Sequence, residues 1–303
     1  MAVSTRPTSG DSPARRYRAR QSRTQILRHV SQAIFAGIIL TAAVVHNLST
    51  MDGATPSIDA LCPFGGFETL WTWIVSGGSF VPKTHLSNLV LAAGLLLAVL
   101  VSGGAFCGWV CPFGALQDAL NWVRTRLRIP EIHVPQALDR VLRYGRYVVL
   151  TLILYKTATT VTLMFADIDP YRTLFSLEWL FDFNPAEHLT AYVAALVVVV
   201  GSLLVERAWC RYLCPLGGAI SLLGNLSLLR IRRAEATCKD CALCERPCPV
   251  KLNVANAETI SSNCIGCLAC VQACPRHDTL AIQLAPAWLP RRKTSVAQPS
   301  TGD

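Results

Sequence analysis

Eight cysteines near the end of the chain form a doubled motif, and no other feature limits the fold as strongly. Each half reads C-x2-C-x2-C-x3-C-P, and both halves lie within residues 238–275. In such a run three thiolates bind one [4Fe–4S] cluster, and the fourth crosses to the partner cluster. This rule assigns one ligand set to Cys238, Cys241, Cys244 and Cys274. It assigns the other to Cys248, Cys264, Cys267 and Cys270. Zinc is the alternative, but a zinc site needs four ligands and gives no reason for the doubled spacing.

At these positions the segment resembles a bacterial two-cluster ferredoxin. The resemblance implies a small α+β domain that carries single electrons and needs no substrate pocket. We place this domain at residues 230–285, where 230–237 form a charged linker and 286–303 a C-terminal tail. Clusters assemble in a reducing compartment, so we expect the domain to be cytoplasmic.

The rest of the chain is too apolar for an ordinary soluble protein. Of its 303 residues 52% are hydrophobic and only 16% are charged, and the mean hydropathy is +0.38. We expect residues 1–24 to be a disordered basic tail. Residues 25–229 are predicted to be a mainly α, four-helix integral membrane domain. The four apolar stretches are residues 28–48, 86–106, 146–166 and 189–209.

Charges between the apolar stretches alternate in sign. The chain through Arg28 carries seven arginines against one acid, and residues 107–146 carry six against three. Residues 49–85 and 167–188 are instead acidic. The positive-inside rule then places both termini and the ferredoxin domain in the cytoplasm, as the clusters require independently. We therefore expect a multi-pass protein of the bacterial inner membrane.

The membrane part contains two copies of one unit. The motif C-x3-C-P occurs at 107–112 and again 103 residues later at 210–215. At the same offset His85-Leu-Ser recurs as His188-Leu-Thr. This pattern predicts two two-helix repeats that run in the same direction.

Each C-x3-C-P motif places two thiols on one face at the end of a helix. If the repeats pack together, Cys107, Cys111, Cys210 and Cys214 converge at the cytoplasmic surface beside the ferredoxin. Four convergent thiols can hold a metal centre or form reversible disulfides. The alternative is that these small apolar side chains only fill space. Cys62 stands outside all of these motifs, and we expect it to pack rather than to bind.

This combination resembles the NapH family of membrane ferredoxins, with relatives in the NosR and CcoG groups. The resemblance rests on four apolar helices, the two C-x3-C-P motifs and the doubled cysteine run, over about residues 28–280. It implies electron transfer between the quinol pool and a soluble or peripheral redox partner. NosR-type relatives add an outer flavin-binding domain and CcoG-type relatives a further C-terminal domain, and neither matches a segment of this sequence.

Three ionisable residues are candidates for quinone or proton chemistry. His85 and His188 stand at the outer starts of the helices that lead to the cysteine motifs, and Lys156 falls within the third apolar stretch. A histidine there can ligate a metal or accept a proton from a quinol. A charge within a membrane is itself a functional hypothesis. The structural alternatives are a polar residue at the interface for the histidines and an internal ion pair for Lys156.

No phosphate-binding glycine loop, nucleophile triad or dinucleotide fingerprint is present in the sequence. Because membrane topology accounts for the net charge of +9, nucleic-acid binding is disfavoured. We expect an electron-transfer subunit with two [4Fe–4S] clusters that works with quinone. Whether it is an enzyme in its own right is left open. A factor that reduces copper or a disulfide for another enzyme is the alternative.

Overall fold

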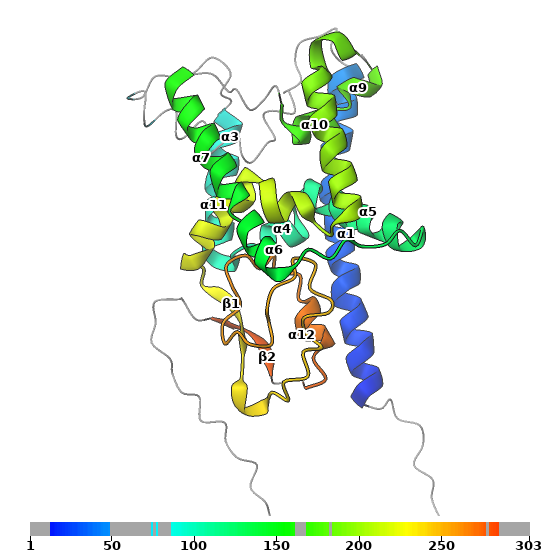
Figure 1. The fold of residues 1–303 in the computed structure, drawn as a ribbon, viewed down its shortest axis with the longest axis vertical. Coiled ribbons are helices and arrows are strands. Elements are labelled where there is room, and N and C mark those ends of the chain that lie inside the picture. The colour runs from blue at the N-terminus through cyan, green and yellow to red at the C-terminus, as the bar shows by residue number, and fades with distance from the viewer. Residues whose placement is uncertain are drawn as a thin grey trace, which may run out of the picture.

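The computed structural model describes residues 13–48, 74, 77, 86–160, 168–181, 184–276 and 279–284. In this part of the chain, long helices occupy one half of the molecule and the cysteine-rich C-terminal segment occupies the other (Figure 1). Short helices lie between the two halves. The helix α1 runs along both halves and thereby joins them.

The long helices match the predicted apolar stretches in place but not in length. They are α1 (Pro13–Leu48), α3 (Leu86–Ser102), α7 (Gly145–Thr160) and α10 (Pro185–Leu204). Among the described residues only Arg23–Leu48 is long and apolar enough to cross a membrane by itself. Val90–Ser102 and His188–Leu204 are apolar but shorter. The predicted second and fourth stretches were too long, because α3 ends at Ser102 and α10 at Leu204.

The basic N-terminal segment is helical from Pro13, so the expectation of disorder is wrong for residues 13–24. Five of the twelve residues in this segment are arginine and two are alanine, and both residue types favour helix. The next turn is also held in place, because Gln25 donates a hydrogen bond to the carbonyl oxygen of Cys267 at 3.0 Å. A contact with a residue so distant in sequence cannot be read from local composition.

Short helices follow each C-x3-C-P motif. The first copy contains α4 (Ala105–Trp109) and leads into α5 (Pro112–Arg126). The second contains a π-helical turn, η2 (Trp209–Leu213), and leads into α11 (Pro215–Leu223) and η3 (Gly224–Leu226). Pro112 and Pro215 each stand at the first position of the new helix, where the missing amide hydrogen costs nothing. The other short helices are α6 (Gln136–Leu142), α8 (Pro170–Phe175) and α9 (Glu178–Phe181).

Each of the short helices α5 and α11 packs against long helices of both repeats. The helix α11 of the second repeat packs with α7 of its own repeat and α3 of the first, through a core that includes Val99, Leu150 and Ile220. The helix α5 of the first repeat packs with α1 of its own repeat and with α10 of the second, and Phe113, Phe175 and Val198 lie in this core. This shared packing brings the two cysteine motifs together between the helix pairs.

The C-terminal segment contains a two-stranded antiparallel sheet and one short helix. Strand β1 (Leu229–Arg233) pairs with β2 (Leu280–Leu284), with Ile231 opposite Ile282. The turn η4 (Glu235–Thr237) follows β1, and α12 (Ala269–Ala273) lies among the cysteines. Residues 230–233 are therefore a strand, and the predicted linker over 230–237 is wrong there. Ile231 is buried in the domain core while its arginine neighbours lie towards the surface.

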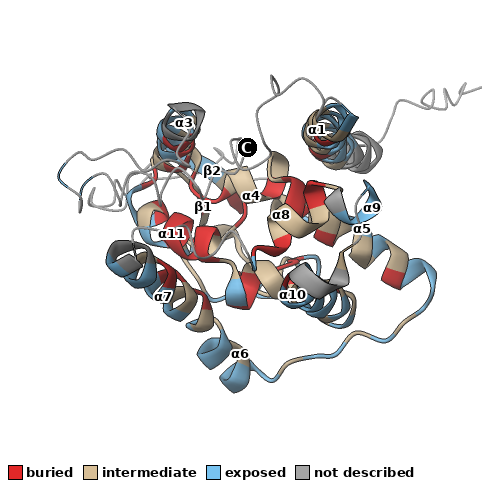
Figure 2. Cartoon of the chain, turned by 90° about the horizontal axis from the view of Figure 1, so that it is seen from above, coloured by how far each residue is buried: buried red, intermediate tan, exposed pale blue. Residues whose placement is uncertain are grey.

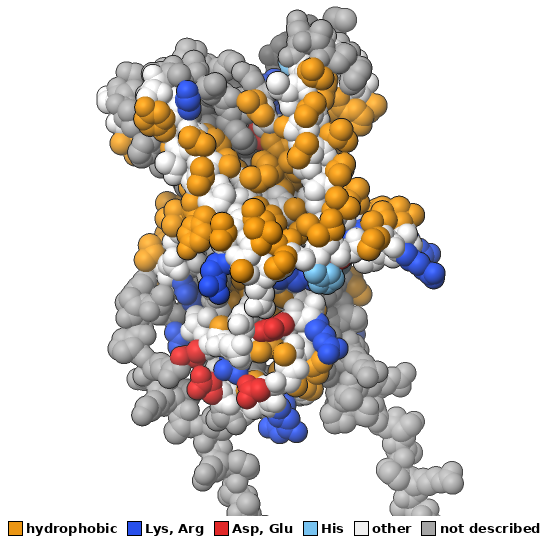
Figure 3. Space-filling model, in the orientation of Figure 1, with side chains coloured by type: hydrophobic (Ala, Val, Ile, Leu, Met, Phe, Trp, Pro, Cys, Tyr) orange, Lys and Arg blue, Asp and Glu red, His pale blue; other side chains and the backbone are white. Residues whose placement is uncertain are grey.

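The long helices expose many large apolar side chains. Viewed from above, their outer faces are exposed and burial is concentrated where the short helices meet (Figure 2). Space-filling shows a broad apolar band over the helical half and mixed charges over the cysteine-rich half (Figure 3). Exposed members of this band include Ile34 and Ile38 on α1, Leu97 on α3, Leu152 on α7 and Leu196 on α10.

Candidate iron–sulfur and thiol site

The first cysteine set of the ferredoxin motif lines a single cavity. Cys238, Cys241, Cys244 and Cys274, here termed the distal set, surround a cavity of about 30 Å³. Burial raises the pKa of the Cys244 thiol, and nearby Cys274 and Cys238 raise it further. Cys274 thus lies with the first motif although it belongs to the second, as the crossover rule predicts.

The second set is also gathered together. Cys248, Cys264, Cys267 and Cys270, the proximal set, lie close enough to interact electrostatically. Burial raises the pKa of Cys264 to about 12, and Cys267 and Cys248 contribute to the increase. Backbone amides of Leu252 and Gly266 donate to the sulfurs of Cys248 and Cys264, both at 3.4 Å. Such hydrogen bonds stabilise thiolates bound to iron.

Both sets contribute to the core of the C-terminal domain. Cys270 and Cys274 pack with Ile231, Val254 and Leu280. The domain is small, so groups held by these thiols would supply much of its stability. Among the described residues, no group of His, Cys, Asp or Glu is arranged to hold a single metal ion.

Removing iron with a chelator is therefore expected to unfold the C-terminal domain while the helical half stays folded. Limited proteolysis detects which part of the chain has unfolded. We expect cleavage to appear within residues 238–276 after chelation, with the fragment that contains α1 to α11 protected. An unchanged cleavage pattern would contradict a structural contribution from bound clusters.

The two C-x3-C-P motifs meet between the halves of the molecule. Cys107, Cys111, Cys210 and Cys214, here termed the cysteine quartet, line one cavity of about 40 Å³. All four thiols are free and partly buried. Burial raises the pKa of Cys107 and Cys214, and neighbouring thiols of the quartet raise it further. The predicted convergence of the two repeats is thus present in the geometry.

The quartet adjoins the proximal set. Cys264 and Ile265 also line the quartet cavity. The side chain of Cys107 packs against those of Cys248, Ile265 and Cys267. The distal and proximal sets meet in turn through Cys274 and Cys270. The three thiol sets therefore follow one another from the helical half to the far side of the C-terminal domain.

The two halves dock closely at α4. A Cβ added at Gly104 would lie 2.3 Å from the carbonyl oxygen of Cys264, and one at Gly108 would lie 2.2 Å from that of Ile265. The indole nitrogen of Trp109 donates to the carbonyl oxygen of Gly266 at 3.0 Å. Only glycine permits this approach of the α4 backbone to the loop that carries Cys264 and Cys267.

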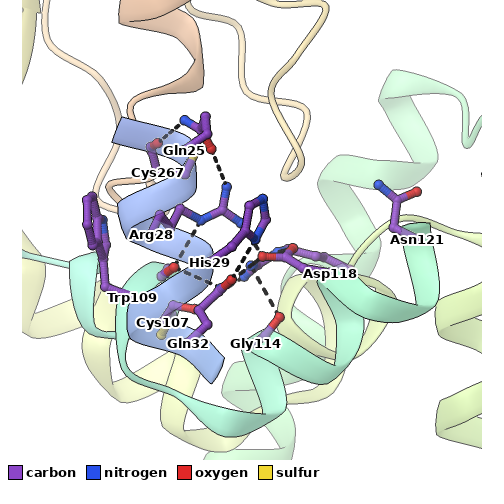
Figure 4. A network of polar contacts seen from close by, with 12 residues as sticks. Gln25, Arg28, His29, Gln32, Cys107, Trp109, Gly114, Asp118, Asn121 and Cys267 are labelled. Atoms are coloured by element: carbon purple, nitrogen blue, oxygen red, sulfur yellow. Dashed lines mark hydrogen bonds and ion pairs between the residues drawn. The ribbon is translucent and has the colours of Figure 1, made fainter. Parts of the chain in front are cut away.

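A buried ionic network supports the quartet. Arg207 is fully buried and donates to Asp118 Oδ1 at 2.8 Å and Oδ2 at 2.6 Å. Arg28 forms an ion pair with the same carboxylate, and Gln32 donates to it at 2.9 Å. Burial by itself would raise the pKa of Asp118, but Arg207 and Arg28 hold it below its usual value. Figure 4 shows Arg28, Gln32 and Asp118 converging beside Cys107.

Sequence reasoning did not find this network. Arg207 precedes the second motif by three residues, and Asp118 follows the first motif within α5. The available signal was a pair of opposite charges flanking two cysteine motifs. Arg207 and Asp118 pair because α5 of the first repeat packs against α10 of the second.

Of the histidine and lysine candidates, the structure describes His188 and Lys156, and both lie away from the thiols. His85 lies outside the described residues. His188 is exposed near the start of α10, where its ring contacts Tyr192, and the second motif follows the other end of that helix. Lys156 is exposed near the end of α7 that lies farthest from the C-terminal domain. Their roles in quinone or proton chemistry remain predictions.

Comparison with known proteins agrees with these motifs. The model of a "4Fe-4S binding domain" matches twice, at residues 84–130 and 187–233. These matches lie 103 residues apart, as do the C-x3-C-P motifs. The model of a "4Fe-4S dicluster domain" matches residues 230–275. No solved structure matches the chain significantly.

Several known proteins are similar to a large part of the chain. The putative electron transport protein YccM of Escherichia coli is 29% identical over 75% of this chain and 64% of its own length. The regulatory protein NosR of Pseudomonas aeruginosa is 34% identical over 55% of this chain. The chain spans only 23% of that NosR, and so less than two thirds of either relative.

The ferredoxin-type protein NapH of Haemophilus influenzae is 31% identical over 63% of this chain and 67% of its own length. The methylamine utilization ferredoxin-type protein MauN of Methylobacillus flagellatus is 28% identical over 70% of this chain. Together with the two iron–sulfur domain models, these matches show that the chain belongs to the NapH-type family of ferredoxin-type electron-transfer proteins, which is related to NosR.

Proposed function

We propose that the protein is a multi-pass membrane protein that transfers electrons between the quinone pool and a soluble or peripheral redox protein. The observation that carries this proposal is spatial: three thiol sets adjoin one another in a series from the helical half to the far side of the C-terminal domain. When bound, a [4Fe–4S] cluster accepts and releases one electron. The thiols fix where such clusters would lie, and the glycine contacts at α4 keep the proximal set against the quartet.

The apolar band supports the membrane location. Its members lie on α1, α3, α7 and α10, and the charged C-terminal domain lies on one side of it (Figure 3). We propose that all four helices cross the inner membrane, with α3 and α7 continuing into segments outside the described residues. The ferredoxin domain would then face the cytoplasm, as the distribution of arginine predicts.

A cavity beside the quartet, lined mostly by charged and polar side chains, is the candidate site for a quinone head group. It has a volume of about 430 Å³, within the range of small-molecule sites. Arg143, Arg211 and Asn263 line both this cavity and the quartet cavity, so a ligand here would lie beside the thiols. His133 also lines it, and histidine is a side chain that can exchange a proton with a quinol. Asp139, by contrast, is paired with Arg143 and Arg211. Ile132, which lines the cavity, is exposed.

An anaerobic redox titration followed by EPR, with iron, copper and zinc measured on the same sample, tests this function. We expect reversible one-electron signals from at least two clusters and iron as the main metal. Copper bound at the cysteine quartet, without reversible reduction of any cluster, would instead favour a factor that reduces or delivers metal for another enzyme.

A further inference from the structure

We propose that the cysteine quartet holds one [4Fe–4S] cluster shared between the two repeats, and that buried Arg207 and Arg146 balance its negative charge. This inference deepens the proposed function and rests on it. It adds a third cluster to the two expected in the ferredoxin domain. Arg207 and Arg146, which were not candidates from the sequence, would help to set the reduction potential of this third cluster.

The backbone of the quartet matches that of a ferredoxin cysteine. Cys111 has φ −63° and ψ 119°, and Cys214 has φ −63° and ψ 114°. Cys274 of the distal set has φ −71° and ψ 123°. Each precedes a proline, which excludes the helical conformation. The C-x3-C-P sequence of the repeats is also the last part of each ferredoxin motif, although there its two thiols belong to different sets.

The quartet has the donor environment of a cluster site. The backbone amide of Gly217 donates to the sulfur of Cys214 at 3.3 Å. Gln117 Nε2 donates to the sulfur of Cys210 at 3.3 Å. Cys111 and Cys214 also stand at the N-cap positions of α5 and α11, whose dipoles favour negative charge.

The cavity between the quartet thiols is similar in size to the cavity between the distal thiols. Their volumes are about 40 Å³ and 30 Å³, and the ferredoxin motif predicts a cluster at the distal thiols. Each repeat supplies two thiols, so neither repeat alone can complete the site.

Two buried arginines face this site. Arg207 donates to the carbonyl oxygen of Cys107 at 3.3 Å and interacts electrostatically with Cys210 and Cys267. Arg146 lines the cavity and donates to Asn263, the neighbour of Cys264. Four thiolates bound to a 2+ cluster core leave a net negative charge, and one added electron makes that charge more negative. Buried cations stabilise the reduced form without a proton, so they raise the reduction potential.

Iron content of the anaerobically purified full-length protein tests the shared cluster. We expect about twelve irons per chain, falling to about eight in Cys210→Ser. The matched control Cys62→Ser alters a cysteine outside all of the motifs and is expected to retain about twelve. About eight irons in the wild type, with no change in Cys210→Ser, would overturn the third cluster while leaving the two-cluster ferredoxin intact. Loss of the ferredoxin signals themselves would instead contradict the proposed function.

The midpoint potential tests the role of Arg207. In Arg207→Gln we expect one cluster signal to shift to lower potential, while the signal of the distal set stays in place. Arg207→Lys keeps the charge and should restore most of the shift. If a properly loaded Arg207→Gln protein titrates as the wild type does, Arg207 has only a structural role. A single copper or zinc ion, or two disulfides, at the quartet would overturn the cluster assignment.

Discussion

Replacing Arg207 with methionine is expected to destabilise the protein by about 3–5 kcal/mol, because it leaves a buried charge without its main partner. Asp118 would retain only Arg28 and Gln32, and the carbonyl oxygens of Cys107 and Gly114 would lose a donor. Thermal unfolding in detergent, followed by circular dichroism, measures the change in stability.

A matched control and a double variant make this test specific. Arg126→Met lies on the exposed side of α5 and is expected to change stability little. Adding Asp118→Asn to Arg207→Met removes the uncompensated carboxylate and should recover part of the loss. If Arg207→Met is as stable as the control, the ionic network does not hold the two repeats together.

Replacing both Gly104 and Gly108 with alanine is expected to separate the two halves of the electron path. Each new Cβ would meet a backbone carbonyl oxygen at 2.3 Å or less, and a backbone cannot give way as a flexible side chain can. Such overpacking costs about 1–3 kcal/mol per site. We expect the clusters of the ferredoxin domain to load normally, whereas electron exchange between that domain and the membrane fails.

The control for the glycine variant is Gly94→Ala on α3, where an added Cβ meets no atom within 4 Å. It should behave as the wild type in iron content and in electron exchange. Wild-type exchange in the Gly104→Ala/Gly108→Ala protein would mean that close docking at α4 is not needed.

The cysteine sites could be predicted because their information is local. The spacing of Cys238 to Cys274 fixes which thiols share a loop, and the offset between Cys107 and Cys210 reveals the duplication. The proline after each second cysteine also identifies a chain turn. These features depend on neighbouring residues, so one sequence is enough to find them.

The parts that were missed depend on distant contacts. The helix at residues 13–24 precedes turns that are anchored by Cys267 and Gly108, far along the chain. The arginines of β1 make it look like a charged linker in the sequence, and its pairing with β2 is what identifies it as a strand. Arg207 and Asp118 meet because α5 packs against α10 of the other repeat. The helix α3 also ends earlier than predicted, because Gly103, with φ +61°, allows the chain to turn inside the apolar stretch.

The central claim is that electrons pass between quinone and the ferredoxin domain by way of the cysteine quartet. Its most direct test reduces the clusters chemically in protein reconstituted into nanodiscs, adds a quinone analogue, and follows the distal cluster signal by freeze-quench EPR. Reoxidation by quinone is favourable even if the cluster potentials are low, so the test does not depend on the physiological direction. We predict rapid reoxidation in the wild type and in Cys62→Ser, and loss of most of that rate in Cys210→Ser. Reoxidation of Cys210→Ser at the wild-type rate would contradict the account.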